Sequence, residues 1–321
     1  MSSGPASTPA EQPLGAALLG RVTRFGRHLP EAALRALLRA TLGDRLLALC
    51  LHRIGDSPWL RAATIAPCTI AAERLDRLIE LLLASRPSAA SWLSVTFDDG
   101  YDDAASYVAS RAQRYARVEF IFFVCPEKTE RGAGFRWDAV DEATRAGHRP
   151  SPGLVGTPSD VRLENEHEAL RGLGRRHPYR LADVESVRAL ARLPNVTLGN
   201  HTNGHFRPCL LTDEQASVEY SRSAEDFGRL FGPAQHFAFP YGTPYFDVEP
   251  RHARIAAALG GPLLWSTEGR PYERAERRPG ALLPRFPVDG TMDHRQIATQ
   301  VAVRSALFRL RGKRPFPNEL G

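Results

Sequence analysis

Two adjacent carboxylates, Asp98 and Asp99, follow an apolar run over residues 92–97 and precede Gly100. Buried together at a strand end they would be costly, because both must be desolvated and they repel each other. A bound cation removes that cost. Neighbouring strand residues point in opposite directions, so one acid can bind a metal while the other faces a substrate. The alternative is an ordinary turn whose acids stabilise the next helix N-terminus.

Two histidines, His201 and His205, lie four residues apart further along the chain. Because Asn203 and Gly204 separate them, we expect a turn that aims both imidazoles inward rather than a regular helix. Taken alone, the pair could equally be surface or capping histidines. Together with Asp99 they predict an Asp-His-His site with open positions, which is typical of catalytic metal centres. The donor set suits zinc, with cobalt, nickel or iron(II) as alternatives.

Three further strand-like runs carry residues capable of chemistry: His52, Tyr241 and Arg285. The turn at Pro240–Gly242 offers backbone N–H groups that could bind an oxyanion, and its alternative role is a simple β-turn. In parallel barrels the carboxyl ends of the strands form the reactive face. We therefore expect these distant residues to converge on one site.

The elements that position these residues alternate between short apolar runs and amphipathic segments. Strands are expected at 46–51, 92–97, 118–124, 195–199, 236–239, 262–266 and 282–288. Helices are expected at 70–85, 104–115, 181–193, 212–231, 250–259 and 293–311. This alternation predicts an α/β fold with a parallel sheet.

The domain organisation follows from shifts in composition. Residues 1–13 are rich in Ser, Pro and Ala and are expected to be disordered, and 14–45 read as a helical extension. A single barrel domain is expected over 46–290. Within it, 126–180 are polar and weakly periodic, which predicts an insertion or lid with short helices at 137–145 and 164–173. A basic helix and tail follow over 291–321.

Three motifs in this order resemble the polysaccharide deacetylase family, the nodulation-type carbohydrate esterases: TFDDG at 96–100, HTNGH at 201–205 and FPYG at 239–242. The runs LCLHRI at 49–54 and LPRFPV at 283–288 are also similar to family members. The match covers roughly residues 46–290, most of the chain. The resemblance implies an irregular (β/α) barrel of about seven strands.

The resemblance also implies roles for individual residues. It makes Asp98 the catalytic base, and Asp99, His201 and His205 the ligands of a divalent metal. It assigns the backbone N–H of Tyr241 to the oxyanion.

At two points the sequence departs from the family pattern. Family members carry an Arg just before Pro-Tyr that braces the catalytic Asp, but Ala238 and Phe239 stand here, so Arg285 is the candidate replacement. The family's catalytic acid is a His in a Leu-x-x-His motif near the C-terminus, which is missing here. Because a barrel is cyclic, His52, in a Leu-x-x-His run of the first strand, could deliver the same group. His294 is the weaker candidate.

These roles predict a metal-dependent hydrolase of linear amides. It would remove an acyl group, expected to be acetyl, from an N-acyl amino sugar in a glycan or glycolipid intermediate. One alternative is an amidase or deformylase with another amide substrate. A second is a catalytically inactive carbohydrate-binding barrel.

The composition limits the partners, the cysteine sites and the location that can be expected for this protein. The net charge is +6, which fits either an anionic partner or a GC-rich genome that encodes Arg for Lys. The four cysteines include no CxxC pair, so they do not predict a zinc-thiolate site or a disulfide framework. No secretory signal or transmembrane run is evident, so we expect a cytoplasmic protein. Peripheral membrane contact through the basic C-terminal helix stays open. Nucleic-acid binding is not expected, because the Arg residues are dispersed.

Overall fold

The computed structural model describes residues 25–56, 66–88, 90–149 and 170–311. The expected disordered N-terminus, the middle of the expected insertion and most of the expected helix at 164–173 lie outside the described residues, as does the tail beyond Arg311. Of the expected extension at 14–45, the described part contains helix α2, Glu31–Leu42, which starts after Pro30 and ends at Gly43.

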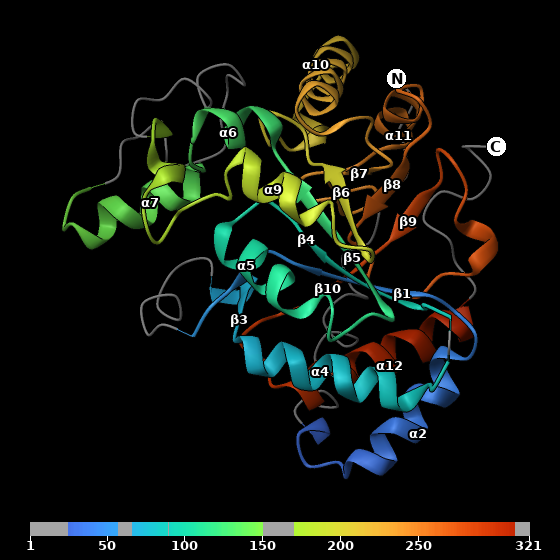
Figure 1. Cartoon of the computed structure of the whole chain (residues 1–321). Helices are drawn as coiled ribbons and strands as arrows, with labels where there is room; N and C mark the ends of the chain where they lie inside the picture. The colour runs from blue at the N-terminus through green and yellow to red at the C-terminus, as the bar shows by residue number, and fades with distance from the viewer. Residues whose placement is uncertain (1–24, 57–65, 89, 150–169, 312–321) are drawn as a thin grey trace, which may run out of the picture.

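A parallel sheet of eight strands forms the centre of the molecule (Figure 1). In spatial order the strands are β10 (Phe286–Pro287), β1 (Leu47–Leu51), β4 (Leu93–Phe97), β5 (Val118–Val124), β6 (Val196–Asn200), β7 (His236–Ala238), β8 (Leu263–Ser266) and β9 (Leu282–Pro284). Strands β1 and β4 are buried along their whole length, as expected for parallel strands covered on both faces. The α/β barrel predicted from the sequence is confirmed.

The barrel closes at Arg285, which alone separates β9 from β10. On one side Pro284 pairs with Ser266 of β8, and on the other Phe286 pairs with Leu49 of β1. The sequence predicts one continuous strand over 282–288, but the segment changes partner at Arg285 and so is divided in two. Eight strands are counted instead of about seven because this one barrel position holds two of them.

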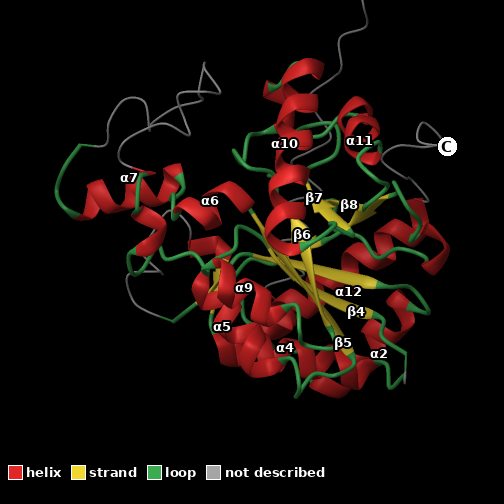
Figure 2. Cartoon of the chain, turned by 45° about the horizontal axis from the view of Figure 1, so that its top comes forward, coloured by secondary structure: helices red, strands yellow, loops and turns green. Residues whose placement is uncertain are grey.

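Helices surround the sheet (Figure 2). Besides α2 they are α4 (Ala72–Ser85), α5 (Asp102–Arg111), α6 (Pro126–Arg131), α7 (Arg136–Arg145), α9 (Val184–Leu190), α10 (Asp213–Phe231), α11 (Pro250–Ala257) and α12 (His294–Arg311). Helices α6 and α7 belong to the expected insertion and extend to one side of the barrel (Figure 1). The short parallel pair β2 (Arg53–Ile54) and β3 (Thr69–Ile70) was not expected from the sequence.

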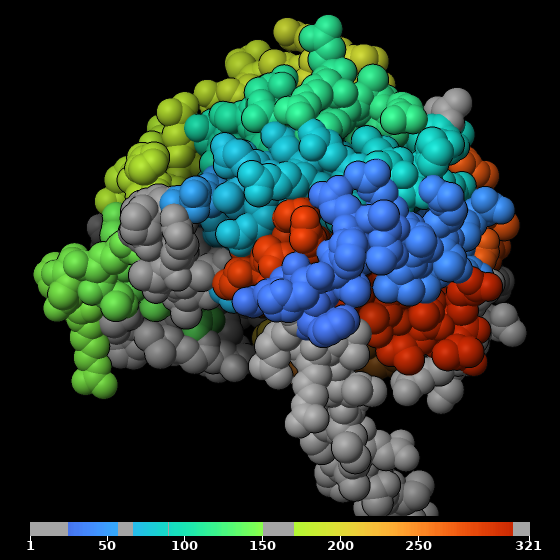
Figure 3. Space-filling view, turned by 90° about the horizontal axis from the view of Figure 1, so that it is seen from below, coloured from blue at the N-terminus to red at the C-terminus, as the bar shows by residue number. Residues whose placement is uncertain are grey.

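Helix α12 lies beside α2 and α4 on the face of the molecule seen in Figure 3. Its residues Ile297, Ala298, Val301 and Ala302 are buried in the main hydrophobic core. The apolar side of this basic helix therefore packs on the protein itself. No helix among the described residues combines the length and the apolar character needed to cross a membrane.

Candidate metal and catalytic site

The candidate site lies at the carboxyl ends of the barrel strands, and sheet hydrogen bonds continue into it. Asp98 directly follows β4 and its N–H donates to Leu51 of β1 at 2.9 Å. His201 directly follows β6 and its N–H donates to Val124 of β5 at 2.9 Å. These backbone hydrogen bonds fix the start of both functional loops to a rigid scaffold.

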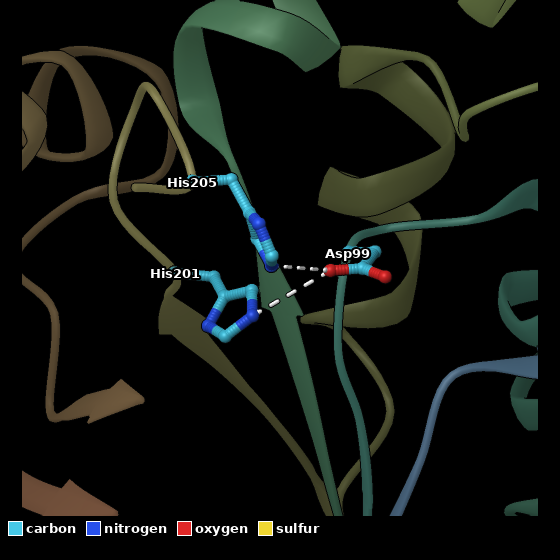
Figure 4. Close-up of side chains that lie close together, drawn as sticks. All are labelled: Asp99, His201 and His205. Carbon is cyan, nitrogen blue, oxygen red and sulfur yellow. Dashed lines mark ion pairs between the residues drawn. The ribbon is translucent and has the colours of Figure 1, made fainter. Parts of the chain in front are cut away.

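Asp99, His201 and His205 offer ligand atoms that all lie within 4.8 Å of one another. Asp99 Oδ1 lies 3.2 Å from His205 Nε2 and 3.5 Å from His201 Nε2, so the three side chains point to one place (Figure 4). This buried oxygen has no hydrogen-bond partner. An orphaned carboxylate oxygen facing two imidazoles fits a divalent cation, because buried polar atoms are otherwise satisfied. Within the described ranges no other such cluster of His, Cys, Asp and Glu occurs.

The tautomer of His201 is fixed by the backbone. Its Nδ1 lies 2.9 Å from the carbonyl oxygen of Ala238, and a carbonyl only accepts, so Nδ1 carries the proton. The lone pair is thereby left on Nε2, which faces Asp99. Burial lowers the pKa of His201 to about 4, which favours the neutral, ligating form at neutral pH.

The imidazole of His205 is positioned by neighbouring rings, whereas that of His201 is positioned by a hydrogen bond to the backbone. The Nδ1 of His205 is buried without a partner. The rings of Phe135 and Trp137 meet its imidazole nearly at right angles, with centroids 5.4 and 5.0 Å away. Trp137 Nε1 donates to the Tyr101 hydroxyl at 2.9 Å, and that hydroxyl donates to Asp138 at 2.8 Å. A hydrogen-bonded chain thus supports one of the rings that orient His205.

The loops of the site adopt strained backbone conformations. Asp99, Thr202, His205 and Tyr241 have φ values of 73°, 63°, 57° and 62°, although none is glycine. A positive φ is most unusual for the β-branched Thr202. Hydrogen bonds hold this turn, including one from the N–H of His205 to Thr202 Oγ1 at 3.1 Å. Such strain persists where surrounding contacts over-determine it, and it clusters at functional sites.

Asp98 and Arg285 form a buried two-pronged pair. Arg285 Nη1 donates to Asp98 Oδ1 at 2.5 Å and Nη2 donates to Oδ2 at 2.9 Å, with both residues at most 3% exposed. Burial alone raises the pKa of Asp98, but Arg285 and then His201 lower it by more, so it is held well below its usual range. Asp98 is therefore ionised, and its Oδ2 lies 3.8 Å from His201 Nε2.

His52 and His294, the two candidate acids, lie in different surroundings. His52 follows β1 and is half-buried. Burial has the largest effect on the pKa values of Asp98 and Asp99 and raises both. The charge of His52 is among the influences that lower them, so His52 lies within electrostatic reach of both carboxylates. Burial lowers the pKa of His294. The charged groups that also influence this pKa lie in α2, in α4 and next to His294 in the sequence. The site carboxylates are not among those groups.

Tyr241 lies at the mouth of the site and is 45% exposed. Its ring centroid is 5.4 Å from that of His205, and the guanidinium carbon of Arg207 lies 4.4 Å from the ring centre. The turn that contains Tyr241 thus borders the candidate metal ligands.

Sequence reasoning missed the wall that the insertion contributes. Phe135, Arg136 and Trp137 line a pocket together with Lys128, His205 and Tyr241. The available signal was the aromatic pair Phe135 and Trp137 within an otherwise polar segment.

No protein-family model matches the sequence, nor does any curated protein. Solved structures do resemble it. A polysaccharide deacetylase from Bacillus cereus superposes with a TM-score of 0.54 and 12% identity, over 80% of this chain and 68% of that one. The de-N-acetylase from Aggregatibacter actinomycetemcomitans gives 0.53 and 15%, over 80% and 100%. IcaB from Ammonifex degensii gives 0.50 and 19%, over 82% and 98%. The chain therefore has the fold of the polysaccharide deacetylases.

Proposed function

We propose that this chain is a metal-dependent hydrolase that removes an acyl group, in the first place acetyl, from the nitrogen of an amino sugar. One observation carries the proposal: an ionised Asp98, fixed by Arg285, stands beside the Asp99–His201–His205 cluster. A spare carboxylate next to a three-ligand metal set is the composition of a catalytic site. The similarity in fold to a polysaccharide deacetylase and a de-N-acetylase supports the choice of substrate.

Asp99, His201 and His205 would hold the divalent ion, and their carboxylate and imidazole donors suit zinc, cobalt, nickel or iron(II). When bound, the ion supplies positive charge that polarises the amide carbonyl and favours the hydroxide form of a neighbouring water.

The protein's own groups move the protons. Asp98 accepts a proton as the water oxygen forms a bond to the carbonyl carbon, and Arg285 keeps that carboxylate in position. The backbone N–H of Tyr241 donates to the developing oxyanion, and one such donor is worth roughly 3 kcal/mol in comparable sites. As the C–N bond breaks, a protonated His52 gives its proton to the leaving nitrogen. The products are acetate and the free amine.

The test is acetate release by metal-loaded protein. Wild type, Asp98→Asn and the exposed control Asp44→Asn would be assayed on N-acetylated chitooligosaccharides, and on small formylated and cyclic amides. We expect release from the sugars, with a loss of about 100- to 10,000-fold in Asp98→Asn and none in Asp44→Asn. Release only from the other amides would favour an amidase or deformylase. Sugar binding without any release would leave a carbohydrate-binding barrel.

A further inference from the structure

The turn after β7 is strained at the residue whose N–H is proposed to bind the oxyanion. The N–H of Gly242 donates to the carbonyl oxygen of Pro240 at 2.7 Å, and Tyr241 between them has a φ of 62°. Such a hydrogen bond across a residue of positive φ is typical of the classic γ-turn, which is rare and strained. Gly242 has a positive φ as well, 71°. A backbone of this kind keeps its shape only where neighbouring groups hold it.

The turn is packed closely against the end of β8. A Cβ at Gly242 would lie 2.9 Å from the carbonyl oxygen of Phe239, and 3.5 Å from both the Cγ2 and the N of Thr267. Because the oxygen of Phe239 belongs to the backbone, it cannot move aside as a flexible side chain could. Thr267, the nearest residue on the other side, directly follows β8.

Thr267 holds two successive carbonyl groups of the turn. Its hydroxyl donates to the carbonyl oxygen of Tyr241 at 2.8 Å, and its N–H donates to that of Gly242 at 2.8 Å. A hydroxyl has one hydrogen, so Thr267 Oγ1 can only accept from Thr243 Oγ1, which lies 3.4 Å away. The side chain and the backbone of one residue thus fix the two peptide groups that follow Tyr241.

Thr267 is itself anchored to the strand segment that carries Arg285. The carbonyl oxygen of Ser266 accepts from the N–H of Arg285 at 2.9 Å, and the carbonyl oxygen of Arg285 accepts from the N–H of Gly269 at 2.8 Å. Residues on both sides of Thr267 are therefore hydrogen-bonded to the residue that braces the proposed base. This short segment connects the bracing of the base with the turn that borders the metal ligands.

From these contacts we infer that Thr267 is a positioning residue for the reaction: it keeps the turn in the conformation that presents the N–H of Tyr241 to the developing oxyanion. The inference rests on the proposed function and adds a residue to it. Thr267 acts through the backbone of Tyr241 and not on the reacting atoms. An oxyanion donor stabilises the transition state more than the bound substrate, so a misplaced donor lowers kcat and leaves KM nearly unchanged.

The experiment measures acetate release from N-acetylated chitooligosaccharides by the metal-loaded wild type, Thr267→Val and Thr267→Ser. Valine has nearly the shape of threonine but lacks the hydroxyl. We therefore expect kcat to fall by about 10- to 100-fold in Thr267→Val, with KM within about twofold of the wild-type value. Serine keeps the hydroxyl and should retain most of the activity. Thr144→Val is the matched control, because the Thr144 hydroxyl also donates to a backbone carbonyl, that of Val140 in α7, and it should change neither constant.

Two further measurements separate positioning from a general loss of structure. The affinity for zinc should be the same in Thr267→Val and in the wild type, because the three metal ligands keep their contacts. A phosphonamidate analogue of the substrate, whose tetrahedral oxygens resemble the oxyanion, should bind Thr267→Val more weakly by the factor by which kcat/KM falls. Thermal melting establishes that each variant is folded, and Thr267→Ala takes the place of Thr267→Val if the valine variant melts at a lower temperature.

Unchanged kinetics in a folded Thr267→Val or Thr267→Ala variant, with acetate release by the wild type, would overturn the inference and leave the proposed function intact. Equal losses of zinc affinity and of kcat would also overturn it, because Thr267 would then support the whole site. If the wild type releases acetate from no sugar, the proposed function fails and the inference fails with it. A loss confined to kcat in Thr267→Val and recovered in Thr267→Ser supports the inference.

Discussion

The guanidinium of Arg285 donates to both carboxylate oxygens of Asp98, which joins the residue between β9 and β10 to the residue that follows β4. Arg285 also donates to the hydroxyl of Thr96 at 3.0 Å. The bracing of the proposed base therefore depends on the last strand segment of the barrel. Since both partners are almost completely buried, each charge depends on the other for its stability.

Removing one partner of this pair should destabilise the fold more than removing both partners. Arg285→Met should lower the free energy of unfolding by about 3–5 kcal/mol, because it leaves the Asp98 charge buried and uncompensated. Combining it with Asp98→Asn should recover part of that loss. Urea unfolding of the wild type, both single variants and the double variant measures the coupling. Strictly additive effects would contradict the prediction.

The ring contacts on His205 should control metal affinity. Trp137→Leu should weaken binding of zinc by about 10- to 100-fold, as for other groups that orient metal ligands. Tyr101→Phe should show a smaller loss, because the indole keeps its place but loses its acceptor. Competition with a chelator dye measures the affinity. Trp92→Phe is the control, since Trp92 donates to the carbonyl of Arg86 away from the site.

A catalytic acid is needed only when the leaving group is poor. His52→Asn should therefore reduce amide hydrolysis by about 100- to 10,000-fold but affect an activated acetate ester, such as 4-nitrophenyl acetate, far less. His294→Asn should leave both rates unchanged. Equal losses on both substrates in His52→Asn would show that His52 does not act as the acid.

Stability should fall as the pH drops from about 6.5 toward 4, partly through His236. Burial lowers the pKa of His236 from 6.5 to about 4, and its Nδ1 accepts from Trp265 Nε1 at 3.1 Å, so the folded state keeps the imidazole neutral. Between these pH values the unfolded chain binds more protons. The neutral His236 therefore contributes about 3 kcal/mol to the free energy of unfolding above pH 6.5. This contribution is lost as the pH falls to 4.

Denaturant unfolding at several pH values measures this dependence. His236→Gln should flatten the slope between pH 4 and 6.5. The control His28→Gln, at an exposed position, should not. An unchanged slope in His236→Gln would contradict the assignment.

The two faces of α12 should respond differently to a charge. Val301→Asp should destabilise the fold by several kcal/mol, because Val301 lies in the main core. Leu310→Glu should hardly change the free energy of unfolding, because Leu310 is 83% exposed.

Sedimentation of both variants with anionic liposomes tests whether the helix also contacts membranes. A loss of pelleting in Leu310→Glu would support that contact, and equal pelleting would argue against it.

Much of the fold follows from local patterns in the sequence. The run of β-branched and aromatic residues over Val118–Val124 predicts β5 at its observed bounds. The capping box of Thr212 and Gln215 marks the start of α10. The Asp-His-His cluster also follows from the sequence, because residues at the carboxyl ends of parallel strands must converge.

Other features depend on tertiary contacts that no local pattern records. The residues at 282–288 have the sequence pattern of one strand. The segment changes its pairing partner at Arg285 because the barrel closes there, and no local pattern shows that change. The contacts of Trp137 with His205 and Tyr101 join a polar insertion to two distant motifs. The positive φ values of Thr202 and Tyr241 are imposed by their surroundings rather than by residue type.

The pairing of β10 with β1 has a consequence for synthesis on the ribosome. The first barrel strand finds one of its two neighbours only after residue 287 has left the exit tunnel, since Leu49 pairs with Phe286. Until then Asp98 lacks its countercharge, and the edge of β1 is open to pairing with other chains. We therefore expect nascent chains that stop short of Arg285 to depend on chaperones and to be prone to aggregation.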